Sequence, residues 1–190
     1  GRNVAGSYGL RVNSPGAPSV ANDTYEGFDW GVYQNAGEVW DLTGCTIRHN
    51  VYPVYLGGSD VNFTGNTFTE NTFAAVAVGG TLTAAHTIWE GVPGQADWAY
   101  LIQGDVTIPD GKRLTIPAGS VVKFEARPGC NVDRYELFVD GELDVQGAVD
   151  ALVVFTSSRD DLYGGDTNGD DNLTAPSRED WGGIQLRNGL

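Results

Sequence analysis

Residues 8–91 read, in successive blocks of about 22, YGLRVNSPGAPSVANDTYEGFD (8–29), WGVYQNAGEVWDLTGCTIRHNV (30–51), YPVYLGGSDVNFTGNTFTENTF (52–73) and AAVAVGGTLTAAHTIWEG (74–91). Equivalent places in the blocks hold equivalent residues. An apolar side chain stands third in each block, at Leu10, Val32, Val54 and Val76. A Thr followed by an apolar residue stands late in each block, at Thr24-Tyr25, Thr46-Ile47, Thr67-Phe68 and Thr87-Ile88. Self-similarity at a fixed period of this length predicts a solenoid.

Within each block the apolar residues alternate with a period of two, which indicates β-strands rather than helices. Runs such as VYPVYL and DVNFTG are short, rich in β-branched and aromatic residues, and bounded by Gly and Asn. Several short strands in each block, with no helical stripe between them, predict an all-β parallel β-helix of about 22 residues per coil. Equivalent side chains of successive coils should stack inside it.

Strand alternation divides each block into inner and outer positions. The inner positions should be Leu10, Val32, Val54 and Val76, and the outer ones Arg11, Tyr33, Tyr55 and Ala77. Asn50 and Asn71 each follow a Thr by four residues. At that place a stacked amide can satisfy the backbone of a tight bend. We therefore expect a structural polar ladder at these two residues.

Three segments are expected along the chain: coils with 22-residue repeats at 1–91, a linker or register break at 92–104, and a second set of coils at 105–190. Pro93 and Gly94 mark the break. Beyond it the triplets VTI, LTI, LFV and LDV again alternate, separated by PDG, PAG and DGE turns. Residues 183–186 should form a final strand, and an acidic loop is inserted at 157–181.

The runs VTIPDGKRLTIPAGSVVKF, LFVDGELDVQG, LVVFTS and DWGGIQL resemble secreted right-handed parallel β-helix repeat proteins of the pectin-lyase-like superfold. The resemblance implies a right-handed β-helix. It implies less about activity, because this fold hosts lyases, hydrolases, adhesins and passive shafts. The sequence does not contain the series of NTD, paired-Asp, GHG and RIK motifs that pectin hydrolases carry, and His49 and His86 occupy different parts of their coils. We expect no enzymatic activity.

Composition narrows the partners and the compartment. The net charge of -14 and the pI near 4.2 argue against nucleic acid, whose phosphates need a basic surface. No apolar run approaches the ~20 residues of a membrane-spanning helix, so membrane insertion is not expected. Cys45 and Cys130 could form a disulfide in a secreted protein. Their separation in a solenoid favours two buried free thiols instead.

The acidic loop carries the sharpest local motif, Asp166-Thr-Asn168-Gly-Asp170-Asp-Asn172. Oxygen side chains at alternate positions around a Gly resemble the first half of an EF-hand or dockerin loop, which binds Ca²⁺. The twelfth position is Ser177 rather than Glu. The remaining ligands are therefore sought among the flanking acids Asp160, Asp161, Glu179 and Asp180. The alternative is a polar insertion that binds no ion; a bound calcium would be structural.

These features together predict a secreted or cell-surface structural or adhesive segment that is stabilised by calcium. Its partners would be further copies of itself, stacked end to end into a filament, or neighbouring modules of the same chain. The alternative function is polysaccharide binding or cleavage. For that function Tyr33 and Tyr55, one coil apart and both outward, would form an aromatic platform for a sugar ring.

Overall fold

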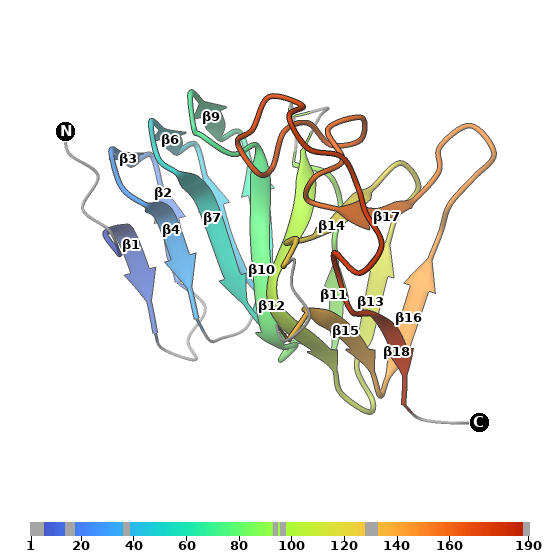
Figure 1. Ribbon diagram of the computed structural model, residues 1–190. Coiled ribbons are helices and arrows are strands. Elements are labelled where there is room, and N and C mark those ends of the chain that lie inside the picture. The colour runs from blue at the N-terminus through green and yellow to red at the C-terminus, as the bar shows by residue number, and fades with distance from the viewer. Residues whose placement is uncertain are drawn as a thin grey trace.

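The computed structural model describes residues 6–13, 18–35, 39–92, 95, 98–127 and 133–187, and every regular element within them is a β-strand. The prediction of an all-β protein is confirmed. The strands pair in parallel in all four sheets. The strands lie side by side from the N-terminal end of the molecule to the C-terminal end (Figure 1). None of the described residues belongs to a helix that is long and apolar enough to cross a membrane.

Each of the first three repeat blocks forms three strands, and we call such a set of strands a pass. Each strand of a pass pairs with the equivalent strand of the neighbouring pass. The first strands of the passes are β1 (Tyr8–Val12), β4 (Trp30–Gln34), β7 (Tyr52–Gly57) and β10 (Ala75–Thr81). The second strands are β2 (Ser19–Ala21), β5 (Trp40–Thr43) and β8 (Val61–Thr64). The third strands are β3 (Thr24–Glu26), β6 (Thr46–Arg48) and β9 (Thr67–Thr69).

The second half of the chain continues the main sheet and adds another short one. The main sheet is extended by β12 (Ala99–Ile108), β14 (Val121–Phe124), β15 (Glu136–Val139), β17 (Val154–Ser157) and β18 (Gly183–Leu186). The short sheet contains β11 (His86–Ile88), β13 (Arg113–Ile116) and β16 (Glu142–Val145). The final strand expected at 183–186 is confirmed.

The register of the main sheet places the expected inner residues in one column. Val32 lies opposite Val54, and Val54 opposite Val76. The column continues through Tyr100 and Val122, and these five side chains are at most 5% exposed and belong to one hydrophobic core. The 22-residue repeat therefore sets the strand register, because a slip by one residue would turn every inner side chain outward.

The predicted polar ladder is confirmed, with Asn50 buried and Asn71 partly buried. Asn50 is 1% exposed. Its Oδ1 accepts from the Phe28 N–H at 3.0 Å, and its Nδ2 donates to the Tyr25 carbonyl at 3.0 Å and to Asn71 Oδ1 at 3.1 Å. Asn71 Nδ2 in turn donates to the Ile47 carbonyl. The two amides therefore bind the backbones of three successive passes together at the bend.

A linker or a register break was expected at 92–104. Residues 99–104 are not a linker, because they belong to β12, whereas the pairing of β12 with β10 does shift in register between Ile102 and Val106. This strand pairs with β10 from Ala99 onward, with a register shift after Val78. Its first part pairs with β14 and its second part with β15, so the main sheet forks at β12. The Pro-Gly turn signal was followed by an alternating run, YLIQGDVTI, long enough to pair with three strands. Strands from both parts of the chain thus share the main sheet.

Cys45 is a buried free thiol, as expected for this residue. Its Sγ lies 3.5 Å from the Thr43 carbonyl oxygen. Cys130, the other cysteine of the sequence, lies outside the described residues.

The buried carboxylate of Asp60, the residue before β8, links the sheet of β2, β5 and β8 to β11. Asp60 is 9% exposed, and its two oxygens accept from the Val61 N–H at 2.8 Å and the Ile88 N–H at 3.1 Å. Desolvation raises the pKa of Asp60, and the two backbone N–H groups offset only part of this rise. The folded state therefore favours the protonated carboxyl more than the unfolded chain does.

Asp60 should make stability fall as the pH rises. Because the pKa of Asp60 is raised in the folded state, this residue does not lower the free energy of unfolding well below pH 4. It lowers that free energy as the pH rises through the folded-state pKa. Urea unfolding of the wild type and of Asp60→Asn between pH 3.5 and 7 tests this. The wild type should lose stability relative to the variant across that range. Parallel pH profiles for the two proteins would contradict the assignment.

Candidate metal centre

The acidic loop at 157–181 folds back onto the outer face of the main sheet. In Figure 1 this segment, which follows β17, crosses β10, β12 and β14. A side chain at Gly164 would lie 2.9 Å from Ala99 Cβ, and one at Gly169 would lie 3.0 Å from a ring carbon of Phe73. Glycines thus allow the loop backbone to approach the sheet closely. The outer positions under it are buried: Ala77, Leu101 and Lys123 are at most 1% exposed.

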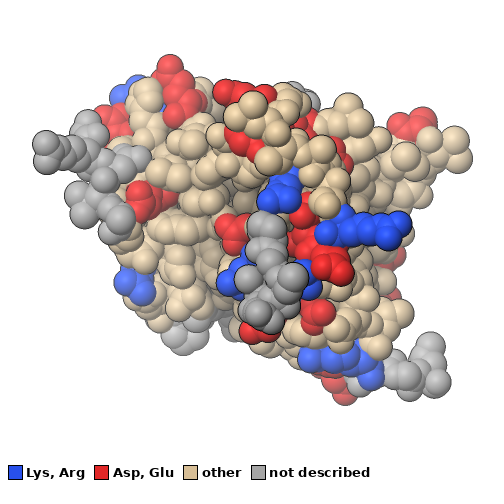
Figure 2. Space-filling model, in the orientation of Figure 1, with Lys and Arg blue, Asp and Glu red and all other residues tan. Residues whose placement is uncertain are grey.

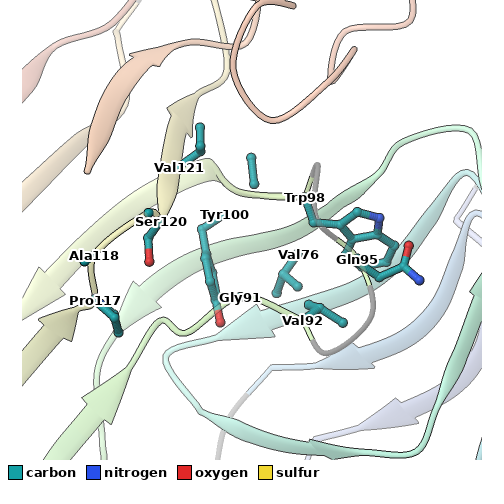
Figure 3. Close-up of a pocket in the computed structure, with 12 residues that line it drawn as sticks. Val76, Gly91, Val92, Gln95, Trp98, Tyr100, Pro117, Ala118, Ser120 and Val121 are labelled. Atoms are coloured by element: carbon teal, nitrogen blue, oxygen red, sulfur yellow. The ribbon is translucent and has the colours of Figure 1, made fainter. Parts of the chain in front are cut away.

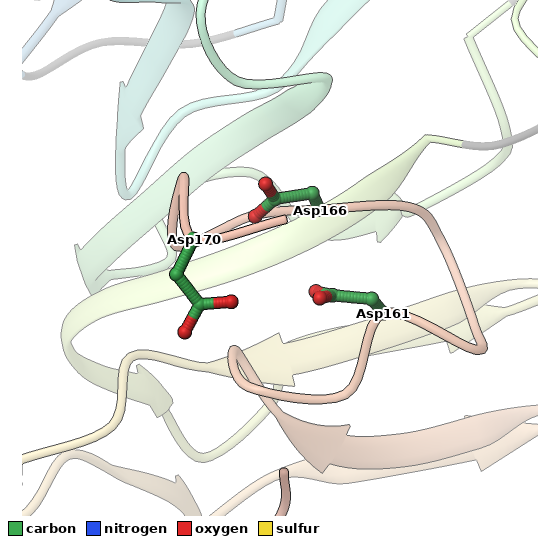
Figure 4. Close-up of side chains that lie close together, drawn as sticks. All are labelled: Asp161, Asp166 and Asp170. Carbon is green, nitrogen blue, oxygen red and sulfur yellow. The ribbon is translucent and has the colours of Figure 1, made fainter. Parts of the chain in front are cut away.

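Three of the expected ligands converge within this loop. Asp161, Asp166 and Asp170 each offer a carboxylate oxygen, and these oxygens all lie within 4.8 Å of one another. Figure 4 shows the three carboxylates around a common space, Asp161 and Asp166 extending from one side and Asp170 from the other. Carboxylate oxygens gathered at this separation are the ligands that Ca²⁺ takes in flexible loops.

Backbone and hydroxyl donors orient two of the carboxylates. Asp166 accepts from the N–H groups of Asn168 and Asp171 at 3.1 and 3.0 Å. Desolvation raises the pKa of Asp166, but hydrogen bonds from backbone N–H groups, led by Asp171, outweigh it and hold the pKa below its ordinary value. The Thr174 hydroxyl is the main cause that lowers the pKa of Asp170. Both groups are therefore preset as anions.

Asp161 is less well satisfied than the other two carboxylates. Its Oδ2 accepts from the Asn172 N–H at 2.9 Å, whereas its Oδ1 is buried without a hydrogen-bond partner. Asn168 Oδ1 is likewise buried and unpartnered, although its Nδ2 donates to Asp170 at 2.9 Å. Desolvation, followed by the neighbouring charges of Asp166 and Asp170, raises the pKa of Asp161. A cation at this place would relieve both the repulsion and the unmet acceptors.

The remaining expected ligands lie elsewhere or contact the cluster through the backbone. Asn172 presents its backbone N–H, rather than a carbonyl oxygen, to Asp161. Asp160 accepts from the Thr156 hydroxyl at 2.7 Å and from the Leu162 N–H. Asp180 is 2% exposed and accepts from Ser157 Oγ at 2.8 Å, and it pairs with Arg159 at 3.1 Å. Asp160 and Asp180 are thus outside the three-carboxylate cluster, because serine, threonine and arginine side chains hold them in structural contacts.

Sequence reasoning gave no role to Lys123, which the loop covers completely. Lys123 is 0% exposed and its Nζ donates to the carbonyl of Gly165, next to Asp166. Burial lowers the pKa of Lys123, and the charges of Asp161, Asp160 and Asp166 act against this lowering. The signal in the sequence was the charged residue between Val122 and Phe124, two inner positions of the same strand.

The loop also bounds a cleft of about 300 Å³ against the sheet. Asn168 and Asp170 line it together with Tyr52, Phe73 and Glu125. Desolvation raises the pKa of Glu125. Of the three clustered carboxylates, Asp170 faces this cleft.

A second cavity, of about 140 Å³, is lined mostly by apolar groups (Figure 3). It lies beside Val76, Trp98 and Tyr100. The Tyr100 hydroxyl donates to the Glu90 carbonyl at 2.8 Å, and Ser120 Oγ donates to the Trp89 carbonyl at 3.2 Å. The hydroxyls of Tyr100 and Ser120 are thereby engaged, and no charged side chain is among the described residues that line the cavity.

Tyr33 and Tyr55 lie on the outer face as expected and stack on each other, with ring centroids 4.5 Å apart and planes 9° apart. Tyr8 packs edge-on against Tyr33 at 4.9 Å. A sugar ring stacks on a free aromatic face, and the two tyrosines use one face each for their mutual contact. Their assignment as a carbohydrate platform stays a prediction.

Charge on the visible face does not form a continuous basic surface. Figure 2 shows the basic side chains lying among acidic ones, with acidic groups also over the loop region.

Comparison with known proteins adds no relative: no family model, no curated protein and no solved structure matches the chain.

Proposed function

We propose that this chain is a structural or adhesive segment of a secreted or cell-surface protein, built as a right-handed parallel β-helix whose acidic loop binds calcium. The in-register column of Val32, Val54 and Val76 supports the β-helix, since it requires one pass of chain directly above the next. The right hand follows the strong preference of parallel crossover connections. The resemblance noted from the VVKF and WGGI runs favours the same fold.

The cluster of Asp161, Asp166 and Asp170 is the observation that carries the calcium assignment. Three carboxylates, an unpartnered Asn168 oxygen and an open cleft form a partial cage. Water would complete the six to eight ligands that Ca²⁺ requires. The bound ion would cross-link three points of the loop between β17 and β18, so its role would be structural.

Removal of calcium should therefore lower the melting temperature. At a calcium concentration 100 times the Kd, the ion stabilises the folded state by about 2.7 kcal/mol, which corresponds to a rise of about 5–11 °C for a chain of this size. Scanning calorimetry with calcium and with chelator measures the shift. The double variant Asp166→Asn, Asp170→Asn should lose it.

Asp171→Asn is the matched control, since Asp171 lies in the same loop and carries the same charge but is absent from the cluster. It should keep the calcium-dependent shift. A wild type that melts at the same temperature in both buffers, or a double variant that keeps the full shift, would refute the calcium site.

The partner surfaces proposed for this segment are the outer edges of its sheets. Among the described strands, β1 lies at one end of the main sheet, and β17 and β18 lie at the other. Leu186 of β18 is 75% exposed. An unpaired parallel edge with exposed apolar side chains accepts another strand. We assign this role to a neighbouring module or a second copy of the chain.

A further inference from the structure

We propose that the Lys123 ammonium is a built-in counter-ion of the acidic loop that sets which cations the loop binds and how tightly. The inference rests on the proposed calcium site and assigns to Lys123 the tuning of its affinity and charge selectivity. Lys123 is not itself a ligand. It acts through its positive charge, fixed beneath the carboxylates.

The position of Lys123 is fixed by the strand and by the loop. It lies in the outer column of the main sheet, opposite Leu101 on one side and Thr156 on the other. Its hydrogen bond to the Gly165 carbonyl holds the ammonium under the loop, and no part of the side chain is exposed. A charge buried in this way is screened far less by salt than a surface charge. Its field therefore acts on the neighbouring carboxylates of Asp161 and Asp166.

The balance of charge between Lys123 and the three carboxylates determines which cations the cluster favours. The three clustered carboxylates carry three negative charges. Lys123 and one Ca²⁺ together neutralise them, whereas a trivalent ion leaves an excess positive charge. Lys123 repels any added cation in proportion to that cation's charge, because Coulomb energy is proportional to the product of the charges. The lysine thus favours divalent over trivalent ions and limits the affinity for both.

The test compares Lys123→Gln and Lys123→Met with the wild type in direct binding of Ca²⁺ and of Tb³⁺. Gln keeps an N–H donor for the Gly165 carbonyl, and Met keeps the apolar volume, so the two variants share only the loss of charge. A unit charge a few ångströms from a divalent ion weakens its binding about tenfold or more. Both variants should therefore bind Ca²⁺ about tenfold more tightly, and Tb³⁺ about thirtyfold more tightly by the same proportionality.

Lys112→Met is the matched control, because Lys112 and Lys123 are the only lysines in the sequence. Lys112 is partly exposed and its Nζ donates to the Thr83 carbonyl rather than to the acidic loop. It should bind both ions as the wild type does.

The outcomes separate this inference from the calcium assignment. If the wild type binds Ca²⁺ and neither Lys123 variant binds it more tightly, the counter-ion role is wrong and the calcium site stands. If the wild type binds neither ion but both Lys123 variants do, the counter-ion role holds and the native calcium site does not. The inference would be overturned if affinity rose equally for Ca²⁺ and Tb³⁺, if it rose only in Lys123→Met, or if none of the proteins bound either ion.

Discussion

Asn50→Ala should lower the free energy of unfolding by about 3–5 kcal/mol, a third or more of the stability of a typical domain. The variant leaves the Phe28 N–H and the Tyr25 carbonyl without their side-chain partner. Each unsatisfied buried group costs about 1–3 kcal/mol, and the missing amide leaves a small cavity beside Asn71. Chemical denaturation monitored by tryptophan fluorescence measures the loss.

Asn62→Ala provides the comparison for this prediction. Asn62 is exposed on β8, and its Nδ2 donates to Asp41 at 2.9 Å. An exposed side-chain pair of this kind contributes little, so the variant should unfold within about 0.5 kcal/mol of the wild type. Equal losses for Asn50→Ala and Asn62→Ala would show that the buried ladder contributes nothing of its own.

Gly58→Ala should be at least as disruptive, with a loss of about 3 kcal/mol or more. Gly58 has a φ of 78°, which strains any residue with a Cβ. An added Cβ would overlap the Thr81 carbonyl oxygen and lie 2.8 Å from its carbon. Backbone atoms cannot rotate away from this contact as a flexible side chain can. The neighbouring strands β7 and β10 would have to separate at their ends, which hydrogen exchange and thermal melting would both detect.

Gly65→Ala separates the strain of the positive φ from the steric overlap with the Thr81 backbone. Gly65 has a similar φ of 63°, but an added Cβ there meets nothing within 4 Å. Its loss should be limited to the backbone term of about 1–2 kcal/mol. If Gly58→Ala costs no more than Gly65→Ala, the close approach of the Thr81 carbonyl is not a stabilising constraint.

The inner columns and the polar ladder could be predicted from the sequence because they depend on local periodicity. Val32, Val54 and Val76 recur at fixed spacing, and strand alternation alone sends them to one side. Asn50 and Asn71 were recognisable in the same way. Asn66, which accepts from the Cys45 N–H and donates to the Leu42 carbonyl, belongs to a second bend of the same kind and was missed, since its spacing from Thr differs.

The fork at β12 could not be predicted from local patterns. Pro93 and Gly94, which lie outside the described residues, are turn signals in the sequence. Whether the run that follows them starts a new sheet or joins the existing one depends on which strands are free to pair. Residues 99–102 pair with β10 and β14, and residues 106–108 with β15. Such a choice is made by pairing across long sequence separations, which propensity does not encode.

The carboxylate cluster was predictable in part. Asp166 and Asp170 follow from the alternating oxygen pattern, and their distance is set by the turn between them. Asp161 joins the cluster only because of how the whole loop folds. Asp180, which is also acidic, contacts Ser157 and Arg159 instead. The burial of Lys123 depends on the loop crossing the sheet. Composition places seven acids in the loop but cannot say which of them meet.

The in-register pairing of Val32 with Val54, and of Val54 with Val76, has a mechanical consequence. Each pass is held mainly by the passes on either side of it, so cohesion is shared among neighbours rather than concentrated at one centre. A pulling force applied along the stack would peel strands away one layer at a time. A loop that contacts several layers, as residues 157–181 do where Gly164 approaches Ala99 of β12 and Val121 of β14 and Gly169 approaches Phe73, would resist that peeling.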